Sequence, residues 1–380
     1  MIALRSTTLR GVLAVIGTII GAGIFGVPAM MDRIGIIGGS IIFWIIATLI
    51  LATHLMFVEV IAAVDGRRRL PGYVGAVLGK GAGRFAVIAN TLQLVGANIA
   101  YIILGGVFLK TLADKSGIVI GLTTWQLLFW LGGAITAYTA LKVMAKVEAA
   151  LSWALVAVML LIFAIAAPRA DLARLGTFDF SQAHAPIGVF LFAMFGLTVI
   201  AEVFELTGRK VKETQRAVCI GTIVAAILTW MFGLFVTLAL PAGAAASPER
   251  ISELFHPALW WVIPLFGFLA IITSFITSSF NLESIYRLDV GTSKIVGWGI
   301  AVVTPLVLVF VMNTDFISII ETVGALFSAT CGLLVALSAH ALYRKKKSRY
   351  PFWRRELIPF AVVILFMATI LQRVFAFALY

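Results

Sequence analysis

Long apolar stretches dominate the chain, and short charged or Gly/Pro-rich segments separate them. A helix that crosses the hydrocarbon core of a bilayer needs about 20 predominantly apolar residues, because each residue advances it by about 1.5 Å. The apolar stretches predict eleven transmembrane helices, at residues 8–31, 35–63, 84–112, 123–141, 147–167, 187–207, 216–240, 258–283, 294–312, 316–342 and 357–379. The pattern therefore predicts an all-α membrane protein.

The spacing of the predicted spans indicates an internal repeat. Spans one to five occupy residues 8–167, spans six to ten occupy residues 187–342, and span eleven at 357–379 is left over. An odd number of spans in each half gives the two halves opposite orientations, which an inverted repeat requires. We therefore expect a single transmembrane domain over residues 1–380, with a five-plus-five inverted repeat and one extra C-terminal helix.

Composition agrees with a membrane protein and excludes a large soluble domain. Of the 380 residues, 62% are apolar and 12% are charged, against about 45–50% and about 25% in soluble domains. The formal charge of +12 would suggest a nucleic-acid partner in a soluble protein, but here the basic residues lie between apolar runs, so we expect no nucleic acid. Cys219 and Cys331 lie inside apolar runs, so no disulfide framework is indicated.

The basic residues also predict the orientation in the membrane. With a cytoplasmic N-terminus, most of the 29 Lys and Arg residues fall in cytoplasmic segments, as the positive-inside rule requires. Eleven spans then place the C-terminus outside, in the cytoplasmic (cell) membrane. The run Arg344–Lys347 is interpreted as a topology anchor, and a specific site for anionic lipids is the alternative.

The first span contains four glycines and a proline within the twelve residues 17–28, G-T-I-I-G-A-G-I-F-G-V-P. Gly and Pro disfavour a helix interior by about 1 and about 3 kcal/mol relative to Ala, so the pattern predicts a broken helix. Gly21, Gly23 and Gly26 formally match a dinucleotide-binding G-x-G-x-x-G, but no strand precedes them and no acidic residue follows about 20 positions on. Gly17 and Gly21 also form the G-x-x-x-G packing pattern, which needs neither the other glycines nor the proline.

A broken helix inside a membrane suggests a binding site. Unpaired backbone groups are tolerated at that depth only where they line a cavity or a site. The free N–H groups at the start of the outer half-helix carry its positive dipole end, and Gly21 and Gly23 have no side chain to block an approach. We expect a substrate carboxylate there.

With these motifs the chain resembles the amino acid/auxin permease family of the amino acid–polyamine–cation superfamily, including bacterial aromatic amino acid permeases and sodium-coupled neutral amino acid transporters. The resemblance rests on residues 17–28, on Phe192-Ala193-Met194-Phe195-Gly196 followed by Glu202, and on Thr273-Ser274-Phe275. It extends in span order over nearly the whole chain. It implies a leucine-transporter-like fold and secondary active uptake by cation symport, with neutral amino acids, including aromatic ones, as the expected substrates.

The resemblance also implies a substrate site at the midplane. It places a second helix break in span six at Gly196, where backbone carbonyls would receive the substrate ammonium group, although the prolines that relatives often carry around this break are absent here. It further implies that spans one, two, six and seven rock as a bundle against a scaffold of spans three, four, eight and nine. The expected substrate residues are Thr18, Ile19, Gly21, Ala22, Gly23, Gln93, Ala97, Phe195, Gly196 and Thr198.

The coupling ion predicted by the same resemblance is Na⁺, and no other cofactor is expected. In the leucine-transporter fold, the A-x-x-T-S spacing of span eight supplies a carbonyl and two hydroxyls to sodium, and carbonyls of the broken first span complete the set. The corresponding residues here are Gly17, Ile20, Ala270, Thr273 and Ser274. Proton-coupled relatives can place a lysine from span five at this position, where this chain has Leu155. Sodium is therefore favoured over protons.

Carboxylates inside the spans keep proton coupling open. Intramembrane carboxylates are costly and usually functional. Glu202 is a candidate for gating or proton transfer, with a structural ion pair as the alternative, and Glu321 also lies within a span. Glu205 is interpreted as an interfacial charge and His54 as a packed or hydrogen-bonded histidine.

Two rival classes of protein are less consistent with the sequence. A channel or facilitator would show rings of like charge or repeated filter loops, and a membrane-embedded enzyme would show a nucleophile–His–acid set or metal ligands. The spans contain neither pattern. We therefore expect a transporter and not an enzyme, with the amino acid substrate and the lipid bilayer as partners and no obligate protein partner.

Overall fold

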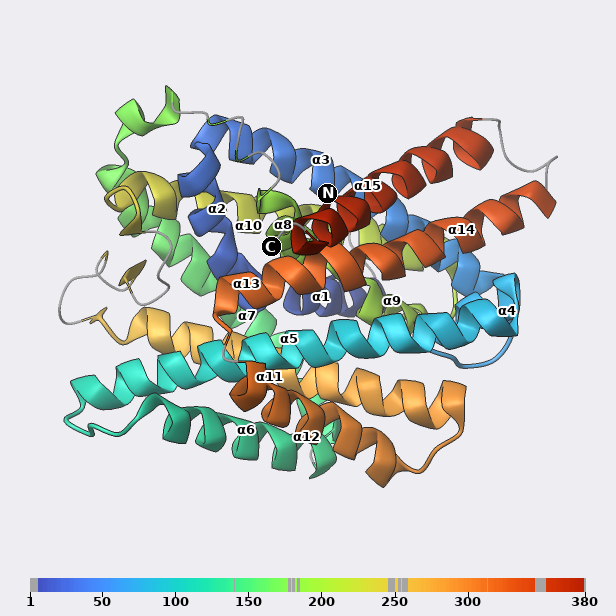
Figure 1. Ribbon diagram of the computed structural model, residues 1–380, viewed down its shortest axis with the longest axis horizontal. Coiled ribbons are helices and arrows are strands. Elements are labelled where there is room, and N and C mark those ends of the chain that lie inside the picture. The colour runs from blue at the N-terminus through green and yellow to red at the C-terminus, as the bar shows by residue number, and fades with distance from the viewer. Residues whose placement is uncertain are drawn as a thin grey trace.

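The computed structural model describes residues 6–139, 141–176, 179, 182, 185–244, 250–251, 254, 259–312, 314–345 and 353–378. All the regular elements in these residues are helical, and most run along the long axis of the molecule (Figure 1). The first half contains α1 (Ser6–Ile19), η1 (Ala22–Gly26), α2 (Val27–Ile34), α3 (Ile36–Ala62), α4 (Leu70–Leu78), α5 (Lys80–Lys115), α6 (Leu122–Thr139), α7 (Leu141–Ala166), η2 (Ala167–Arg169) and η3 (Leu172–Gly176).

The second half also begins with an interrupted helix. It contains α8 (Ala185–Met194), α9 (Leu197–Leu206), α10 (Val211–Ala239), α11 (Val262–Ile285), η8 (Tyr286–Val290), α12 (Lys294–Met312), α13 (Phe316–Thr322), η9 (Val323–Ser328) and α14 (Ala329–Lys345). The C-terminal helix is η11 (Trp353–Leu357) continued by α15 (Ile358–Ala378). The π-helical segments η8, η9 and η11 and the short helix α4 were not expected from the sequence.

Nine described helices are long and apolar enough to cross a membrane, or ten if α1 and α2 are counted as one span bent by 46°. This confirms an all-helical membrane protein. A helix also occupies the fourth predicted span, but α6, with its threonines, glutamine and glycines, is not among those nine or ten. Eleven crossings and the inverted repeat therefore remain predictions.

The helices pack into two groups. The first, which we call the bundle, contains α1, α2, α3, α8, α9 and α10, and the second, the scaffold, contains α5, α6, α11 and α12. Glycines permit close approach within each group: a Cβ on Gly221 would lie 2.7 Å from Val15 Cβ, and one on Gly267 would lie 2.3 Å from the Phe108 ring. The members of each group are those predicted for the rocking bundle and its scaffold.

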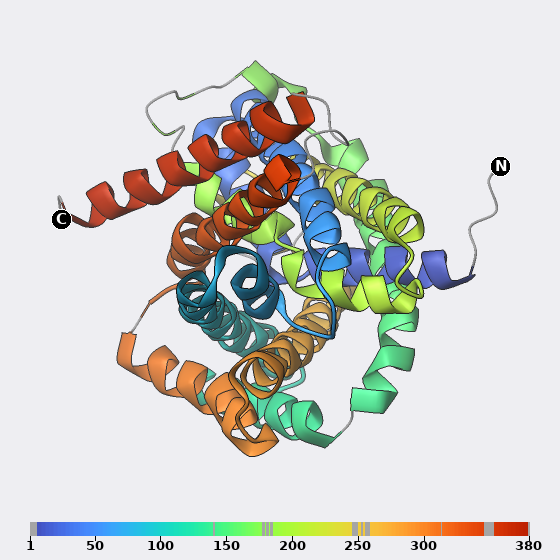
Figure 2. The same ribbon diagram turned by 90° about the vertical axis from the view of Figure 1, so that its right-hand side faces the viewer.

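The remaining helices connect or cover these groups. Helix α7 packs against α1, α10 and α11, whereas α13, η9 and α14 pack against α3, α5 and α8. Figure 2, viewed along the long axis, shows α15 crossing the outside of the molecule. Its exposed side chains are apolar and include Phe360, Ile364, Leu371 and Phe375. Such a surface is stable facing lipid and would be a liability in water.

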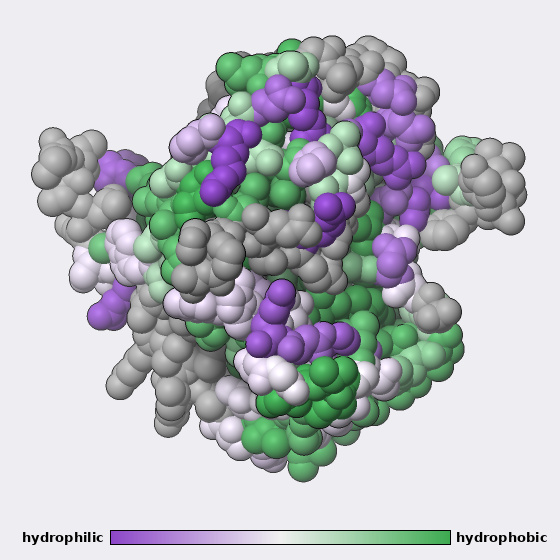
Figure 3. Space-filling model, turned by 90° about the vertical axis from the view of Figure 1, so that its left-hand side faces the viewer, coloured by the Kyte–Doolittle hydropathy of each residue, from purple (hydrophilic) through white to green (hydrophobic). Residues whose placement is uncertain are grey.

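One end of the molecule carries clusters of hydrophilic residues. Figure 3 shows hydrophilic residues over the end that carries the connections after α2 and α10, with hydrophobic residues along the lower rim. At this end Arg174 pairs with Asp32 and bonds to the carbonyls of Thr237 and Leu240. These contacts fix the end of α10 beside α2.

Candidate substrate-binding site

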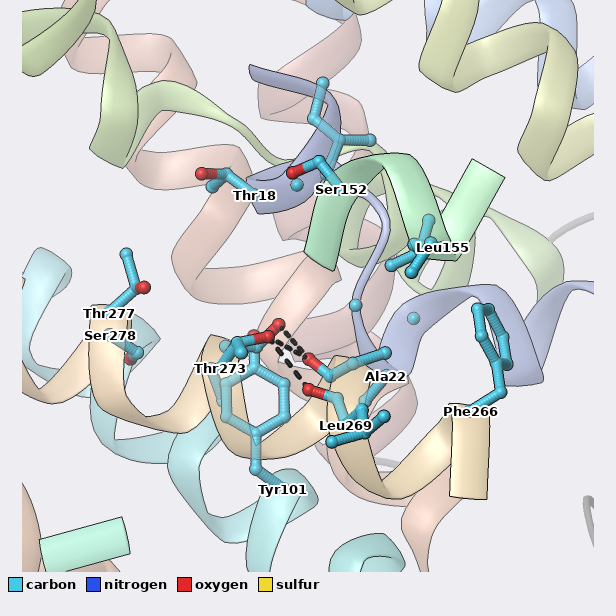
Figure 4. Close-up of a pocket in the computed structure, with 18 of the residues that line it drawn as sticks. Thr18, Ala22, Tyr101, Ser152, Leu155, Phe266, Leu269, Thr273, Thr277 and Ser278 are labelled. Atoms are coloured by element: carbon cyan, nitrogen blue, oxygen red, sulfur yellow. Dashed lines mark hydrogen bonds between the residues drawn. The ribbon is translucent and has the colours of Figure 1, made fainter. Parts of the chain in front are cut away.

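A cavity of about 270 Å³ lies where the bundle, the scaffold and α7 meet. Its walls come from the break between α1 and η1, from α5, α7 and α11, and from the break between α8 and α9. In Figure 4 the extended backbone of the first break runs between α7 and α11, with Thr18 and Ser152 on one side and Tyr101 and Thr273 on the other. The cavity therefore occupies the position predicted for substrate.

The first break releases backbone groups at the cavity. The last regular helical bond of α1 joins Ile20 N–H to the Ile16 carbonyl at 2.9 Å, and Gly21 N–H then donates to Ile19 instead of Gly17. Gly21 has φ −126° and ψ −147°, so the chain is extended at this point. The Gly17 carbonyl thereby loses its helical donor at a position where Gly17 lines the cavity.

The two glycines of the break have different neighbours. A Cβ on Gly21 would lie 2.8 Å from Ser274 Oγ, so α11 lies directly against the extended backbone. A Cβ on Gly23 would lie 2.5 Å from Ala193 Cα. The absence of a side chain at Gly23 thus lets η1 contact the backbone of α8, a role that the sequence interpretation, which saw only room for an anion, missed.

Neutral oxygens gather on the α11 side of the cavity. Thr273 Oγ1 donates to the carbonyls of Leu269 and Ala270 at 3.0 Å, and Ser274 Oγ donates to Ala270 at 2.8 Å. Their protons point into the helix, which leaves oxygen lone pairs for another ligand. Gly17 also lines the cavity, whereas Ile20 does not. Four of the five residues predicted for sodium are therefore brought together. The two hydroxyls and the Gly17 carbonyl offer neutral oxygens of the kind that a hard cation binds, whereas the Ala270 carbonyl already accepts both hydroxyls.

The cavity brings together nine of the ten residues predicted for substrate. They are Thr18, Ile19, Gly21, Ala22, Gly23, Gln93, Ala97, Phe195 and Thr198. Gly196 lies behind the wall, where its backbone N–H donates to His54 Nε2 at 3.2 Å. The predicted second break is present, because α8 ends at Met194 and α9 begins at Leu197.

Several lining residues were not predicted. Tyr101 follows Gln93 and Ala97 at a spacing of four residues, so the periodicity of one helical face could have identified it. Ser152, Phe192, Phe266, Thr277 and Ser278 also line the cavity. The hydroxyls of Thr18 and Ser278 are buried without a hydrogen-bond partner, so they are available to a ligand.

The candidate carboxylates lie outside the cavity. Glu202 Oε1 lies 2.8 Å from Arg69 Nη1, and Glu321 Oε1 lies 2.6 Å from Arg373 Nη1. Glu205 pairs with Arg209 at 2.6 Å. The described residues that line the cavity carry no formal charge, and Leu155 is among them.

An uncharged cavity between two interrupted helices, inside a membrane-spanning helical body, is an arrangement suited to a membrane transporter. The sequence profile of the tryptophan/tyrosine permease family matches residues 5–374, and the chain belongs to that family. This agrees with the predicted resemblance to aromatic amino acid permeases.

Structural comparison supports the fold and nothing finer. The chain is similar to a manganese transporter of Eremococcus coleocola, solved in complex with an aromatic bis-isothiourea substituted compound. The two share 15% sequence identity and a TM-score of 0.69, over 96% of this chain and 86% of the other. No curated protein sequence matches the chain.

Proposed function

We propose that the protein takes up aromatic amino acids across the cytoplasmic membrane by cation symport, with Na⁺ as the coupling ion. The observation that carries the proposal is the cavity at the first break, where released backbone groups meet the α11 hydroxyls. Family membership supports an aromatic substrate. Alternating access between the bundle and the scaffold would expose this site to each side in turn.

The cavity has complementary groups for each part of an amino acid. The substrate carboxylate would bind the backbone N–H groups of Ala22 and Gly23, at the positive end of the outer half of the broken span. The ammonium group would bind carbonyls of the second break. The aromatic side chain would pack against apolar lining residues such as Phe192 and Phe266.

Sodium is preferred over protons because the cavity offers neutral oxygens. Glu202 and Glu321, the carboxylates considered as proton carriers, are paired with arginines outside the cavity. The resemblance gives Leu155 the position at which proton-coupled relatives can have a lysine. The site is proposed to lie within an eleven-span protein of five-plus-five inverted architecture, with α6 as the fourth span and α15 as the eleventh. The N-terminus would be cytoplasmic and the C-terminus external.

The test is uptake of radiolabelled tryptophan and tyrosine into proteoliposomes with an imposed sodium gradient, an imposed pH gradient, or neither. Accumulation above equilibrium that requires inward sodium is expected. Accumulation driven only by a pH gradient would show that protons, and not sodium, are the coupling ion. Uptake that never exceeds equilibrium would indicate a facilitator.

Competition by amino acid methyl esters tests the carboxylate site. These esters lack the carboxylate charge and should not compete with substrate. Efficient competition by them would show that the first break does not bind the substrate carboxylate.

A further inference from the structure

His54 lies at the centre of the bundle with both ring nitrogens engaged. The residue belongs to α3 and its side chain is fully buried. Nδ1 lies 3.0 Å from Thr222 Oγ1 on α10, and Nε2 lies 3.2 Å from the Gly196 nitrogen in the second break. The ring therefore connects α3, α10 and the interruption between α8 and α9.

The partners of His54 determine its protonation state. A backbone N–H can only donate, so Nε2 must be an unprotonated acceptor. The proton of the neutral ring is then on Nδ1, where it donates to Thr222 Oγ1. An imidazolium ring has two donors and no acceptor, so it could not make the bond to Gly196.

The bond to Gly196 satisfies a donor that the break would otherwise leave unpaired. In a continuous helix Gly196 N–H would donate to the Phe192 carbonyl, but that carbonyl accepts from Phe195 N–H at 3.2 Å. A buried unpaired N–H is destabilising, so nearly all such groups have partners. A Cβ on Gly196 would lie 3.0 Å from His54 Cε1 and 2.9 Å from Ile19 Cγ1, so a side chain there would force these neighbours to shift.

The same break shapes the cavity. Val199 N–H donates to the Gly196 carbonyl at 3.3 Å, which deprives the Phe195 carbonyl of its helical donor. Phe195 and Thr198, on either side of Gly196, both line the cavity. The orientation of the Gly196 peptide therefore determines how these two residues are presented to a ligand.

We propose that His54, as the neutral Nδ1–H tautomer, is a positioning residue for substrate binding: it holds the Gly196 peptide and thereby fixes the second break. This inference rests on the proposed function, in which the cavity binds the substrate. His54 itself does not line the cavity, so its effect on binding is transmitted through Gly196.

Binding measurements with three variants test the positioning role. His54→Leu removes the acceptor and lets the Gly196 peptide reorient. The dissociation constant for tryptophan should rise about tenfold, which is the effect of losing about one well-oriented hydrogen bond to the ligand. His54→Gln supplies an amide carbonyl as acceptor and should restore most of the affinity. Thr237→Val is the control, because it removes another buried bond within the bundle, from Thr237 Oγ1 to the Pro28 carbonyl at 3.1 Å, and should lower thermal stability without changing affinity.

Nitrogen-15 NMR of histidine-labelled wild-type protein tests the tautomer without any substrate. The chain has four histidines, and the difference spectrum against His54→Gln assigns the signal. A protonated Nδ1 and an unprotonated Nε2 are expected.

The possible outcomes separate this inference from the proposed function. An Nε2–H tautomer or an imidazolium at His54 would overturn the inference, as would unchanged affinity in folded His54→Leu. If His54→Leu does not fold, the NMR result decides. Wild-type protein that binds no aromatic amino acid would instead contradict the proposed function, and the NMR spectrum would still establish whether Nε2 of His54 is unprotonated, as a bond from Gly196 N–H requires.

Discussion

At the scale of single residues, two glycines of the first break each permit a different close contact. Gly21 lets Ser274 approach the extended backbone, and Gly23 lets η1 lie against the backbone of α8. The serine hydroxyl can rotate away from a new methyl group, whereas backbone cannot. Substitutions at the two positions should therefore differ in severity.

Gly23→Ala should impair substrate uptake severely. Its Cβ would lie 2.5 Å from Ala193 Cα, and relieving such overpacking costs about 1–3 kcal/mol while it moves α8 away from η1. Equilibrium binding should weaken about tenfold or more. Gly299→Ala is the control, because a Cβ there meets nothing within 4 Å. Normal binding by Gly23→Ala would show that the α8–η1 contact does not shape the site.

Thr273→Ala combined with Ser274→Ala should abolish sodium stimulation of uptake while the protein stays folded. Both side chains are small, and each loses one neutral oxygen that the cavity offers to a cation. The measurement is initial uptake against sodium concentration in proteoliposomes. Thr139→Ala is the control, because Thr139 makes the same bond to a carbonyl one turn back but is exposed on α6. Sodium dependence that survives the double substitution would show that these hydroxyls are not ligands of the ion.

Motifs within single spans of the sequence predicted part of the cavity wall. The glycines of the first span and the A-x-x-T-S spacing of span eight are sequence-local signals, and both lie on the cavity. Ser152 and Ser278 carry no such signal, because hydroxyls are common in membrane helices and only the packing of α7 and α11 selects these two. The partnership of His54 with Gly196 is likewise invisible in sequence, since it depends on the contact between α3 and the second break.

At the scale of elements, the ends of helices form a polar seam between the bundle and the scaffold. The N–H groups of Arg69 and Gly72 donate to Asp289 of η8 at 2.9–3.2 Å, which ties the start of α4 to the scaffold. The Arg69 side chain bonds Glu202 of α9 at 2.8 Å and Ser284 of α11 at 3.3 Å. Arg69 therefore joins the two groups at the end predicted to be cytoplasmic.

Glu202→Gln should lower the maximal rate of uptake without changing its dependence on sodium or pH. Arg69 is only 10% exposed, so removal of its partner leaves a poorly solvated charge and weakens the seam. Glu205→Gln is the control, because its pairs with Arg67 and Arg209 are at the surface, where ion pairs contribute little. If Glu202→Gln instead abolished a pH dependence present in the wild type, Glu202 would be a proton carrier.

Element boundaries show where hydropathy fails as a guide. The apolar runs located the long helices, because length and composition are properties of one segment. The short helix α4 and the π-helical turns η8 and η9 depend on tertiary contacts, and α6 is helical although its threonines, glutamine and glycines lower its hydropathy.

At the scale of the whole molecule, orientation follows from the distribution of basic residues and can be checked by labelling. In a background with Cys219→Ala and Cys331→Ala, single cysteines are introduced at the exposed positions Ala76 and Ala242. An impermeant thiol reagent applied to intact cells should label Ala242→Cys, and should label Ala76→Cys only after permeabilisation. The opposite pattern would reverse the predicted topology.

The division into bundle and scaffold predicts which distances change during transport. Leu206 at the end of α9 and Leu288 in η8 are exposed on opposite sides of the Arg69 seam, whereas Leu288 and Ile295 belong to η8 and α12, which pack together. Spin labels attached to cysteines at these positions, in the background with Cys219→Ala and Cys331→Ala, allow both distances to be measured by pulsed electron paramagnetic resonance. Because interfaces switch between discrete arrangements while packed groups stay rigid, addition of sodium and tryptophan should shift the Leu206–Leu288 distribution and leave Leu288–Ile295 unchanged. Movement within the control pair would contradict a rigid scaffold, and a Leu206–Leu288 distance that is constant under all conditions would contradict rocking.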